Sequence, residues 1–505
     1  MSPSDSESTA STRNETTMHT LRAAARSRLG IDPRAIAAFR ISLALVVLLD
    51  LLVVRAPGIT TFYTDDGLFP RSALAETFPR LARWSLHTLS GAAWAQALLF
   101  AITALVAVAL LVGYRSRLAA FGSALLLASL YARNPYVVNG GDTILVSLLL
   151  LAALLPLESR WALGRRPLEH PSPGGDAHEE TRVLSAATAT VLLHVAIIYA
   201  LNAALKFRSD AWMDGIAVQR IFQLEDFVHL FGPAIAEHAA VLTAINWLWT
   251  AVLSASVLLV LATDRLRTVT AAAFVCAHLS MAATMRLGAF PFVMVTALLL
   301  YLPSPVWDRL DRLVSERPLE HRLASVSVGR DSDPEPSFRR RVAPSIQRGT
   351  RLITVVFLAV FLLAVVGWQL TAMGFVDDPT SSSDGALEHA SWGFFAPNPP
   401  DSYSWYVVEA ERQSGASIDL VDGEAMDFDR PPNAMDRYPT TLWKRYGTKG
   451  QGVGDALLEP AAAYFCERAP DGVESVTIYR LEQPVDATGP AGEPIRHERI
   501  TTGCG

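Results

Sequence analysis

The sequence predicts an all-α polytopic membrane protein of about nine transmembrane helices, followed by a small α+β extracytoplasmic C-terminal domain. Hydrophobic residues make up 51% of the 505 residues and charged residues 18%, whereas soluble domains carry about 25% charged residues. The apolar residues come in blocks of about 20, the length that spans a bilayer. Residues 374–505 carry 22 acidic and 10 basic residues, so a tail of net charge −12 follows a body of net charge +6.

Composition divides the chain into five parts. Residues 1–30 are Ser/Thr-rich and are expected to form a disordered cytoplasmic tail. A transmembrane domain is expected over 31–306, a basic cytoplasmic linker over 307–350 and a final transmembrane helix over 351–373. Residues 374–505 then form the acidic extracytoplasmic domain. The first apolar run has no small-residue cleavage pattern after it, so we expect it to stay as an anchor.

Nine apolar stretches are candidates for the spans, and two of them, the third and the eighth, are short. They lie near Ala35–Val54, Ala92–Val112, Leu118–Leu130, Thr143–Leu157, Leu184–Leu205, Ala239–Ala262, Val269–Met285, Ala289–Leu302 and Leu352–Leu370.

Arginine placement predicts the orientation, because short loops rich in Lys and Arg stay in the cytoplasm. With the N-terminus inside, the inner segments carry 23 basic residues and the outer loops carry 9, leaving the tail aside. The expected location is therefore the cell membrane, with the N-terminus cytoplasmic and the C-terminal domain outside.

The tail has patterns of both strands and helices. Strand-like runs lie at Ser404–Val408 and Glu474–Leu481, and helical patterns lie near Met435–Tyr446 and Ala456–Glu467. Cys466 and Cys504 both fall in this external domain, where an oxidising compartment permits a disulfide. Two free thiols are the alternative. The acidity of the tail fits either adaptation to high salt or simple solubility, and the sequence does not separate the two.

The fifth predicted span carries a narrow polar stripe. His194, Tyr199, Asn202 and Lys206 fall within an arc of about 140° when each residue turns about 100°. Such a stripe is expected to face a cavity or a partner helix. Lys206 is the only lysine before Lys444, and a desolvated lysine can lose its proton and act as a general base. The alternative is a snorkelling lysine whose ammonium group reaches the outer headgroups.

Further polar residues lie toward the outer side of the predicted spans. His278 in the seventh span would place a second titratable group near Lys206, or it serves only as a hydrogen-bond partner between helices. Asp66, Asn139 and Asp142 belong to outer loops rich in Asp-Gly and Gly-Gly steps. These loops are interpreted either as a lid over a cavity or as turns and helix caps.

Several chemistries have no motif in the chain. A P-loop, a GxGxxG turn, an HExxH helix and a CxxC pair are all missing from the sequence. No metal-ligand spacing is present, so no metal site is predicted. The arginine run at 339–341 is typical of positive charge on the inner membrane face, and no nucleic-acid partner is expected.

The order of these fragments resembles the HTTM (horizontally transferred transmembrane) domain family, which includes the vitamin K-dependent gamma-carboxylases. The matching fragments are YTDDGLFPR at 63–71, GYRSR at 113–117, RNPYVVNGGD at 133–142, Lys206 with WMDG at 212–215, His278 with FPFVM at 290–294, and WGFFAPNP at 392–399.

The resemblance implies a role for Lys206. In the carboxylases, the matching lysine is regarded as the base that deprotonates reduced vitamin K, and the oxygenated quinone then abstracts a glutamate γ-proton. Here, Asn202–Leu205 differs from the small Ala-Gly step before the family's lysine, and the tail of about 130 residues is much shorter than the carboxylase luminal region. Recognition of a substrate glutamate therefore does not carry over.

Two functional hypotheses follow. The first is a membrane enzyme that uses a lipid quinol as cofactor, with Lys206 as base and His278 assisting on the outer side. The second is a non-catalytic membrane protein that matures or holds a partner. Beyond the lipid bilayer, the candidate partners are a quinone and a secreted or membrane peptide. Convergence of Lys206, His278 and the Asp142 loop on one outer cavity would favour the enzyme.

Overall fold

The computed structural model describes residue 17 and residues 20–163, 182–315, 344–376, 392–449 and 455–504. Most of the predicted disordered tail over 1–30 lies outside the described residues, although residues 20–29 are helical. The middle of the predicted linker over 307–350 also lies outside them. At its two ends the structure has helix α17 (Ser304–Ser315) and the start of helix α19 (Pro344–Ala372).

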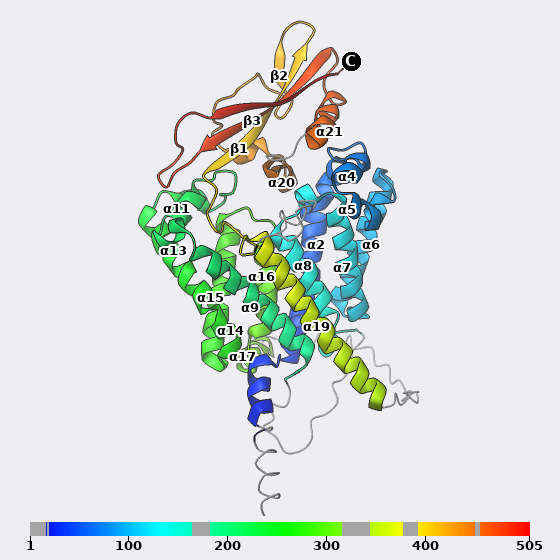
Figure 1. Cartoon of the computed structure of the whole chain (residues 1–505), viewed down its shortest axis with the longest axis vertical. Coiled ribbons are helices and arrows are strands. Elements are labelled where there is room, and N and C mark those ends of the chain that lie inside the picture. The colour runs from blue at the N-terminus through cyan, green and yellow to red at the C-terminus, as the bar shows by residue number, and fades with distance from the viewer. Residues whose placement is uncertain are drawn as a thin grey trace, which may run out of the picture.

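Apolar helices build the body of the molecule (Figure 1). Besides α17 and α19, the main ones are α2 (Pro33–Leu49), α6 (Ala93–Val112), α7 (Ser116–Arg133), α8 (Gly140–Ala152), α9 (Ala186–Lys206), α13 (Ala239–Ser254), α15 (Asp264–Thr284) and α16 (Phe290–Leu298). Short helices connect them: α3 (Ile59–Tyr63), α4 (Arg71–Thr77), α5 (Pro79–Trp84), α10 (Asp210–Met213), α11 (Ala217–Phe222), α12 (Gly232–Ala236) and α14 (Leu258–Leu261).

Six helices in the described part of the chain are long and apolar enough to cross a membrane, or seven if one bent pair counts as a span. The predicted count of nine is not confirmed, although all nine stretches are helical. The fourth stretch forms α8, whose 13 residues rise only about 20 Å at about 1.5 Å per residue. The eighth forms the short helix Phe290–Tyr301, and the chain bends by 104° after it, beside Pro303, before the helix Ser304–Leu313. The third lies in α7, which ends in Arg133 and is not among the six.

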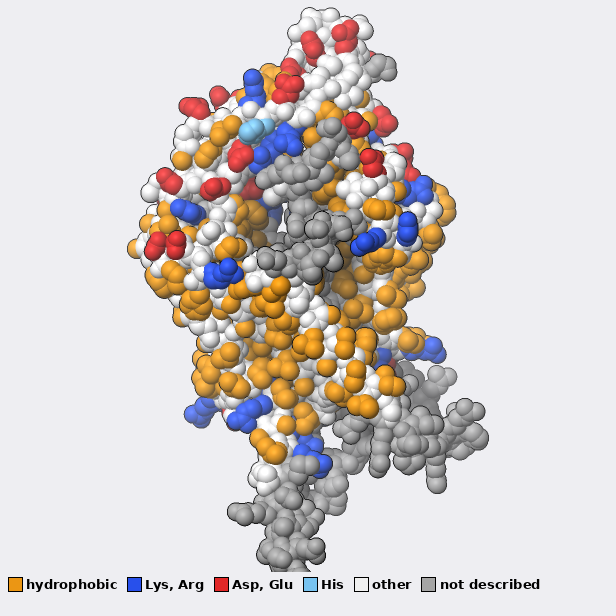
Figure 2. All heavy atoms as spheres, viewed as in Figure 1, with side chains coloured by type: hydrophobic (Ala, Val, Ile, Leu, Met, Phe, Trp, Pro, Cys, Tyr) orange, Lys and Arg blue, Asp and Glu red, His pale blue; other side chains and the backbone are white. Residues whose placement is uncertain are grey.

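The surface is divided into zones along the long axis of the molecule. On the face that Figure 2 shows, hydrophobic side chains form a broad belt across the middle, and Asp and Glu gather at the end away from α17. Lys and Arg lie on both sides of this belt and make up most of the charged side chains near α17. Leu105 on α6 is 69% exposed and Leu363 on α19 is 71% exposed. Because exposed leucines on long apolar helices are favourable in lipid and costly in water, the belt marks a surface that contacts the bilayer.

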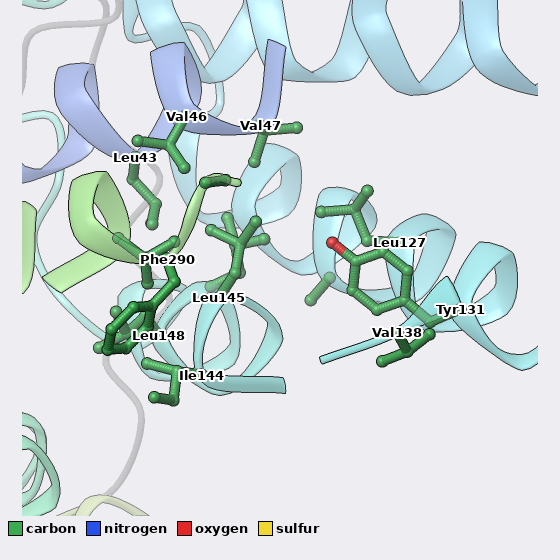
Figure 3. Close-up of a cluster of buried hydrophobic side chains, with 14 of the residues drawn as sticks. Leu43, Val46, Val47, Leu127, Tyr131, Val138, Ile144, Leu145, Leu148 and Phe290 are labelled. Atoms are coloured by element: carbon green, nitrogen blue, oxygen red, sulfur yellow. The ribbon is translucent and has the colours of Figure 1, made fainter. Parts of the chain in front are cut away.

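The core of the bundle lies between α2, α7, α8 and α16. Leu43 and Val47 of α2, Leu145 and Leu148 of α8 and Phe290 of α16 are buried against one another (Figure 3). The second half of the bundle consists of α9, α13 and α15, and α19 packs on α9. The two halves meet along α9, α8 and α16.

The C-terminal region is a small antiparallel sheet covered by two helices, as the sequence predicts. The strands β1 (Ser402–Arg412), β2 (Ser417–Asp419), β3 (Val473–Pro484) and β4 (Ile495–Gly503) lie in the order β2-β1-β3-β4. Strand β1 pairs with β3 from Ser402↔Pro484 onward. The helices α20 (Thr441–Lys449) and α21 (Asp455–Cys466) pack on this sheet, at the end of the bundle opposite α17 (Figure 1).

Candidate functional site

The candidate site begins with α9. Ser185 caps the start of α9 by accepting a hydrogen bond from the backbone N–H of Thr188, and the side chain of Thr188 accepts one from Ser185 N–H. This reciprocal cap fixes where the helix begins. From there α9 runs without a break to Lys206, and its four predicted polar residues, His194, Tyr199, Asn202 and Lys206, are all buried.

A cavity of about 480 Å³ lies beside the C-terminal half of α9. Its walls come from α9, α11, α13, α15 and α16, and from a segment of the tail that includes Phe394 and Phe395. The lining is mostly aliphatic and aromatic. Lys206 and His278 both line it, together with Tyr199 and Asn202.

Lys206 lies at the end of the cavity nearest the tail, with 2% of its surface exposed. Its Nζ donates to the carbonyl of Phe394 at 3.2 Å and lies 3.5 Å from Asn202 Oδ1. The Trp212 ring centroid is 4.5 Å away. No carboxylate among the described residues lies within ion-pair distance of this amine. An ammonium group buried without a counter-ion is unfavourable.

The tail segment that follows the last span closes the cavity beside Lys206. Asn202 Nδ2 donates to Trp392 O at 2.8 Å, Trp212 Nε1 donates to Phe395 O at 3.1 Å, and Ser209 Oγ donates to Asn398 Oδ1 at 2.6 Å. Phe394 also stacks on Phe290 of α16, with ring centroids 4.1 Å apart. The WGFFAPNP motif therefore belongs to the wall of the cavity.

His278 and Tyr199 form a buried pair across α9 and α15. Tyr199 Oη lies 2.9 Å from His278 Nε2, so one of the two donates to the other. His278 Nδ1 is also buried and has no hydrogen-bond partner among the described residues. A buried polar atom without a partner is unfavourable, and this one belongs to a side chain that lines the cavity.

The other predicted lining residues lie elsewhere. His194 Nε2 lies 2.8 Å from Ser147 Oγ of α8, and the His194 ring packs edge-on against the Trp392 ring. Asn139 and Asp142 form the capping box of α8, in agreement with the alternative interpretation of that loop as a cap. Asp66 is exposed, and its backbone carbonyl accepts a hydrogen bond from Arg468. Lys206 and His278 therefore converge on one cavity without the Asp142 loop.

Asp142 instead takes part in a buried ion cluster, which consists of Asp50, Arg55, Asp142 and Arg445. Arg55 bridges Asp50 at 2.7 Å and Asp142 at 2.8 Å, and Arg445 reaches Asp142 at 3.0 Å. Arg445 comes from α20, so the ion cluster joins the tail domain to the helical bundle. No pattern in the sequence predicts this contact.

The neighbour of Arg445 makes a second buried contact with the bundle. Lys444 Nζ lies 3.3 Å from Asp226 Oδ2 in the loop between α11 and α12. Burial lowers the pKa of Lys444 to about 7, with Asp226 opposing the shift, and burial raises the pKa of Asp226. The adjacent Lys444 and Arg445 in an otherwise acidic tail were the only signal in the sequence for this docking helix.

The cysteines divide into a pair and a single thiol. Cys466 at the end of α21 and Cys504 after β4 form a disulfide, with Cα atoms 5.2 Å apart. Cys276 of α15 is a free, exposed thiol and lines the cavity. In the described ranges, no group of three or more His, Cys, Asp or Glu side chains could hold a metal ion.

Apolar helices long enough to cross a membrane, packed around a cavity that holds a buried lysine and histidine, define a multi-pass membrane protein. The family model of the HTTM domain matches residues 29–307, more than half of the chain, and the chain belongs to the HTTM family. No curated protein and no solved structure matches the chain.

Proposed function

We propose that this protein is a membrane enzyme of the carboxylase-like type within its family, and that it removes a proton from a lipid quinol. Lys206 is the general base, and its Nζ takes the proton from a quinol hydroxyl. The observation that carries the proposal is the buried position of this amine, in an apolar cavity where no carboxylate of the described residues pairs with it.

The surroundings of Lys206 suit the neutral amine. A neutral amine has N–H bonds to donate and one lone pair to accept a proton. The Phe394 carbonyl and the Asn202 amide oxygen are both acceptors for those N–H bonds. The lone pair therefore stays available for a ligand in the cavity, and the Trp212 ring stabilises the cation once the proton has moved.

The size and lining of the cavity support a ring-bearing ligand. A volume of about 480 Å³ falls within the range of small-molecule sites, roughly 300–1,000 Å³. Phe290, Phe394 and Trp212 supply aromatic surface for a flat ring. His278 Nδ1, which lacks a partner in the described structure, would bind an oxygen of the ligand while Tyr199 holds its other nitrogen.

We also propose an orientation of the chain in the membrane. The N-terminus would be cytoplasmic in the cell membrane and the tail domain outside, with nine helical segments crossing or entering the bilayer. An odd number of crossings is supported by the position of the tail domain, which lies at the end opposite α17 (Figure 1). The cavity would then open in the outer half of the membrane, where a secreted or membrane peptide could meet the activated ligand.

A non-catalytic role in holding or maturing a partner is the second candidate. The observation in its favour is a cavity of about 260 Å³ between the sheet and the helices α20 and α21. Tyr406, Trp443 and Tyr464 are among the aromatic residues that line it. This role makes no demand on Lys206, so substitutions there separate the two candidates.

The test compares Lys206→Arg and Lys206→Ala with the wild type for oxygen uptake driven by a reduced naphthoquinone in lipid nanodiscs. General-base catalysis is worth about 10²–10⁴-fold, so both variants are expected to lose at least about 100-fold. Arg208→Ala, an exposed basic residue nearby, is the matched control and should retain activity. An active, stable Lys206→Arg variant would contradict the proposal, because arginine does not give up its proton.

A further inference from the structure

The cavity beside Lys206 has one wall that faces the bilayer. Leu248 of α13 is 66% exposed, and Cys276 and Ser280 of α15 are exposed, yet all three line the cavity. Both helices are among the candidate membrane spans. A residue that lines a cavity and also faces outward lies at its mouth, so the gap between α13 and α15 is an opening toward lipid.

The end of the cavity nearest the tail is closed. The Trp392–Asn398 segment covers it and is held by the hydrogen bonds from Asn202, Lys206 and Trp212. Phe394 fills the space next to Phe290 by stacking on it. A ligand from the external water would have to displace this whole segment, whereas a ligand from the bilayer would not.

A polar atom without a partner lies inside the mouth. His278 Nδ1 is buried and lacks a hydrogen bond to any described residue. It lies two residues before Ser280 on α15, and both residues line the cavity. Aliphatic lipid tails could fill the apolar lining but would leave this nitrogen unsatisfied. A lipid that carries an oxygen on its head group would satisfy it.

We propose that the gap between α13 and α15 is a lateral portal, through which a membrane-dissolved lipid with an oxygen-bearing ring enters the cavity ring first. Its ring oxygen would lie at His278 Nδ1, and its chain would pass between Leu248 and Cys276 into the bilayer. This portal rests on the proposed function, because it supplies the ring on which Lys206 acts.

Cys276 provides a native probe of the portal, because it is the one free thiol and lines the mouth. The experiment measures the rate of its alkylation by a membrane-permeant maleimide in lipid nanodiscs. The probe ligand is a naphthoquinone with a polyprenyl tail and a methyl group on its remaining quinone-ring carbon. Its tailless counterpart is 2,3-dimethyl-1,4-naphthoquinone, and neither has a free quinone-ring position to react with a thiol.

At a concentration of ten times its Kd, the tailed quinone should slow the alkylation of Cys276 by about tenfold, as mass action requires. The matched control is Cys276→Ala with Leu279→Cys, because Leu279 is 47% exposed on the same helix but does not line the cavity. Its thiol should show no protection. The portal would be overturned if the thiol at position 279 were protected equally, or if Cys276 were not protected. It would also be overturned if only the tailless quinone protected Cys276.

The Lys206→Ala variant separates this inference from the proposed function. It should bind the tailed quinone and protect Cys276 as the wild type does, since the portal does not need the amine. Protection of Cys276 together with full activity of Lys206→Arg would leave the portal in place and remove the base. If Cys276 is not protected but activity still requires Lys206, the portal is wrong and the role of Lys206 as base remains.

Discussion

At the scale of single residues, two adjacent basic side chains determine how the tail meets the membrane bundle. Arg445 completes the buried ion cluster with Asp142, Arg55 and Asp50, in which two positive and two negative charges balance. Lys444 forms a second buried ion pair, with Asp226. Buried charges are tolerated when they are paired, and removing one partner leaves the other uncompensated.

Replacing Arg445 by Met should destabilise the protein by about 3–5 kcal/mol, the usual cost of breaking a buried ion pair from one side. The expected result is a clear fall in the thermal unfolding midpoint in detergent. Adding Asp142→Asn should recover part of the loss, because it removes the unbalanced negative charge. If Arg445→Met unfolds at the wild-type temperature, the cluster contributes little to stability.

Lys444 predicts a dependence of stability on pH. Its pKa is lowered from 10.5 to about 7 by burial, so between these values the unfolded chain holds a proton that the folded chain has released. Stability should therefore rise with pH across this window, by at most about 1.4 kcal/mol per pH unit. In Lys444→Met this part of the rise should vanish, as followed by unfolding midpoints from pH 7 to pH 10. An unchanged slope in the variant would contradict the shift.

The sequence predicted some of the site residues and could not predict how they are grouped. A helical wheel shows that His194, Tyr199, Asn202 and Lys206 share one side of α9, but it does not show which element lies against each of them. In the structure His194 contacts Ser147 of α8 and the Trp392 ring. The other three residues line the cavity. The partner of Arg445 lies 303 residues away, and no local pattern reveals such a contact.

At the scale of elements, length and bending explain where the predicted spans differ from the helices. Periodicity and hydropathy place all nine stretches in helices, yet α8 ends after 13 residues, and the chain bends by 104° beside Pro303, directly after the eighth stretch. In the tail, the alternation in β1 and β3 predicts both strands. The strands β2 and β4 lie at the edges of the sheet and were missed, because edge strands have weaker burial patterns.

The disulfide ties α21 to the last strand, and its loss should be measurable. The sequence separation of 38 residues between Cys466 and Cys504 corresponds to about 3–4 kcal/mol in the chain-entropy model. Cys466→Ser and Cys504→Ser should each lower the unfolding midpoint by a similar amount. Alkylation of the unreduced wild type should modify Cys276 alone, and modification of all three cysteines would show that the bridge is not formed.

At the scale of the whole molecule, charge and hydrophobicity are separated along one axis. On the face that Figure 2 shows, the hydrophobic belt lies between the end at α17, where most charged side chains are Lys or Arg, and the end at the tail domain, where Asp and Glu gather. Short basic segments stay in the cytoplasm, so this distribution predicts that α17 is inside and the sheet domain outside.

Cysteine labelling in intact cells tests this orientation. In a Cys276→Ala background, Ser414→Cys in the turn after β1 should react with a membrane-impermeant maleimide. Arg312→Cys on α17 should react only after the cells are opened. Both positions are exposed, so a difference in labelling reports the side of the membrane. The reverse pattern would show that the tail is cytoplasmic and that the cavity opens in the inner half of the bilayer.

An absorbance spectrum tests whether Lys206 takes the proton of a bound quinol. A naphthohydroquinone and its anion absorb at different wavelengths, so the ionised fraction can be read under anaerobic conditions, where no oxidation follows. In nanodiscs containing the wild type, the bound hydroquinone should ionise at a lower pH than in empty nanodiscs. Lys206→Ala and Lys206→Arg should bind the hydroquinone without this shift. Ionisation at the same pH with and without the lysine would show that Lys206 does not take the proton of the hydroquinone.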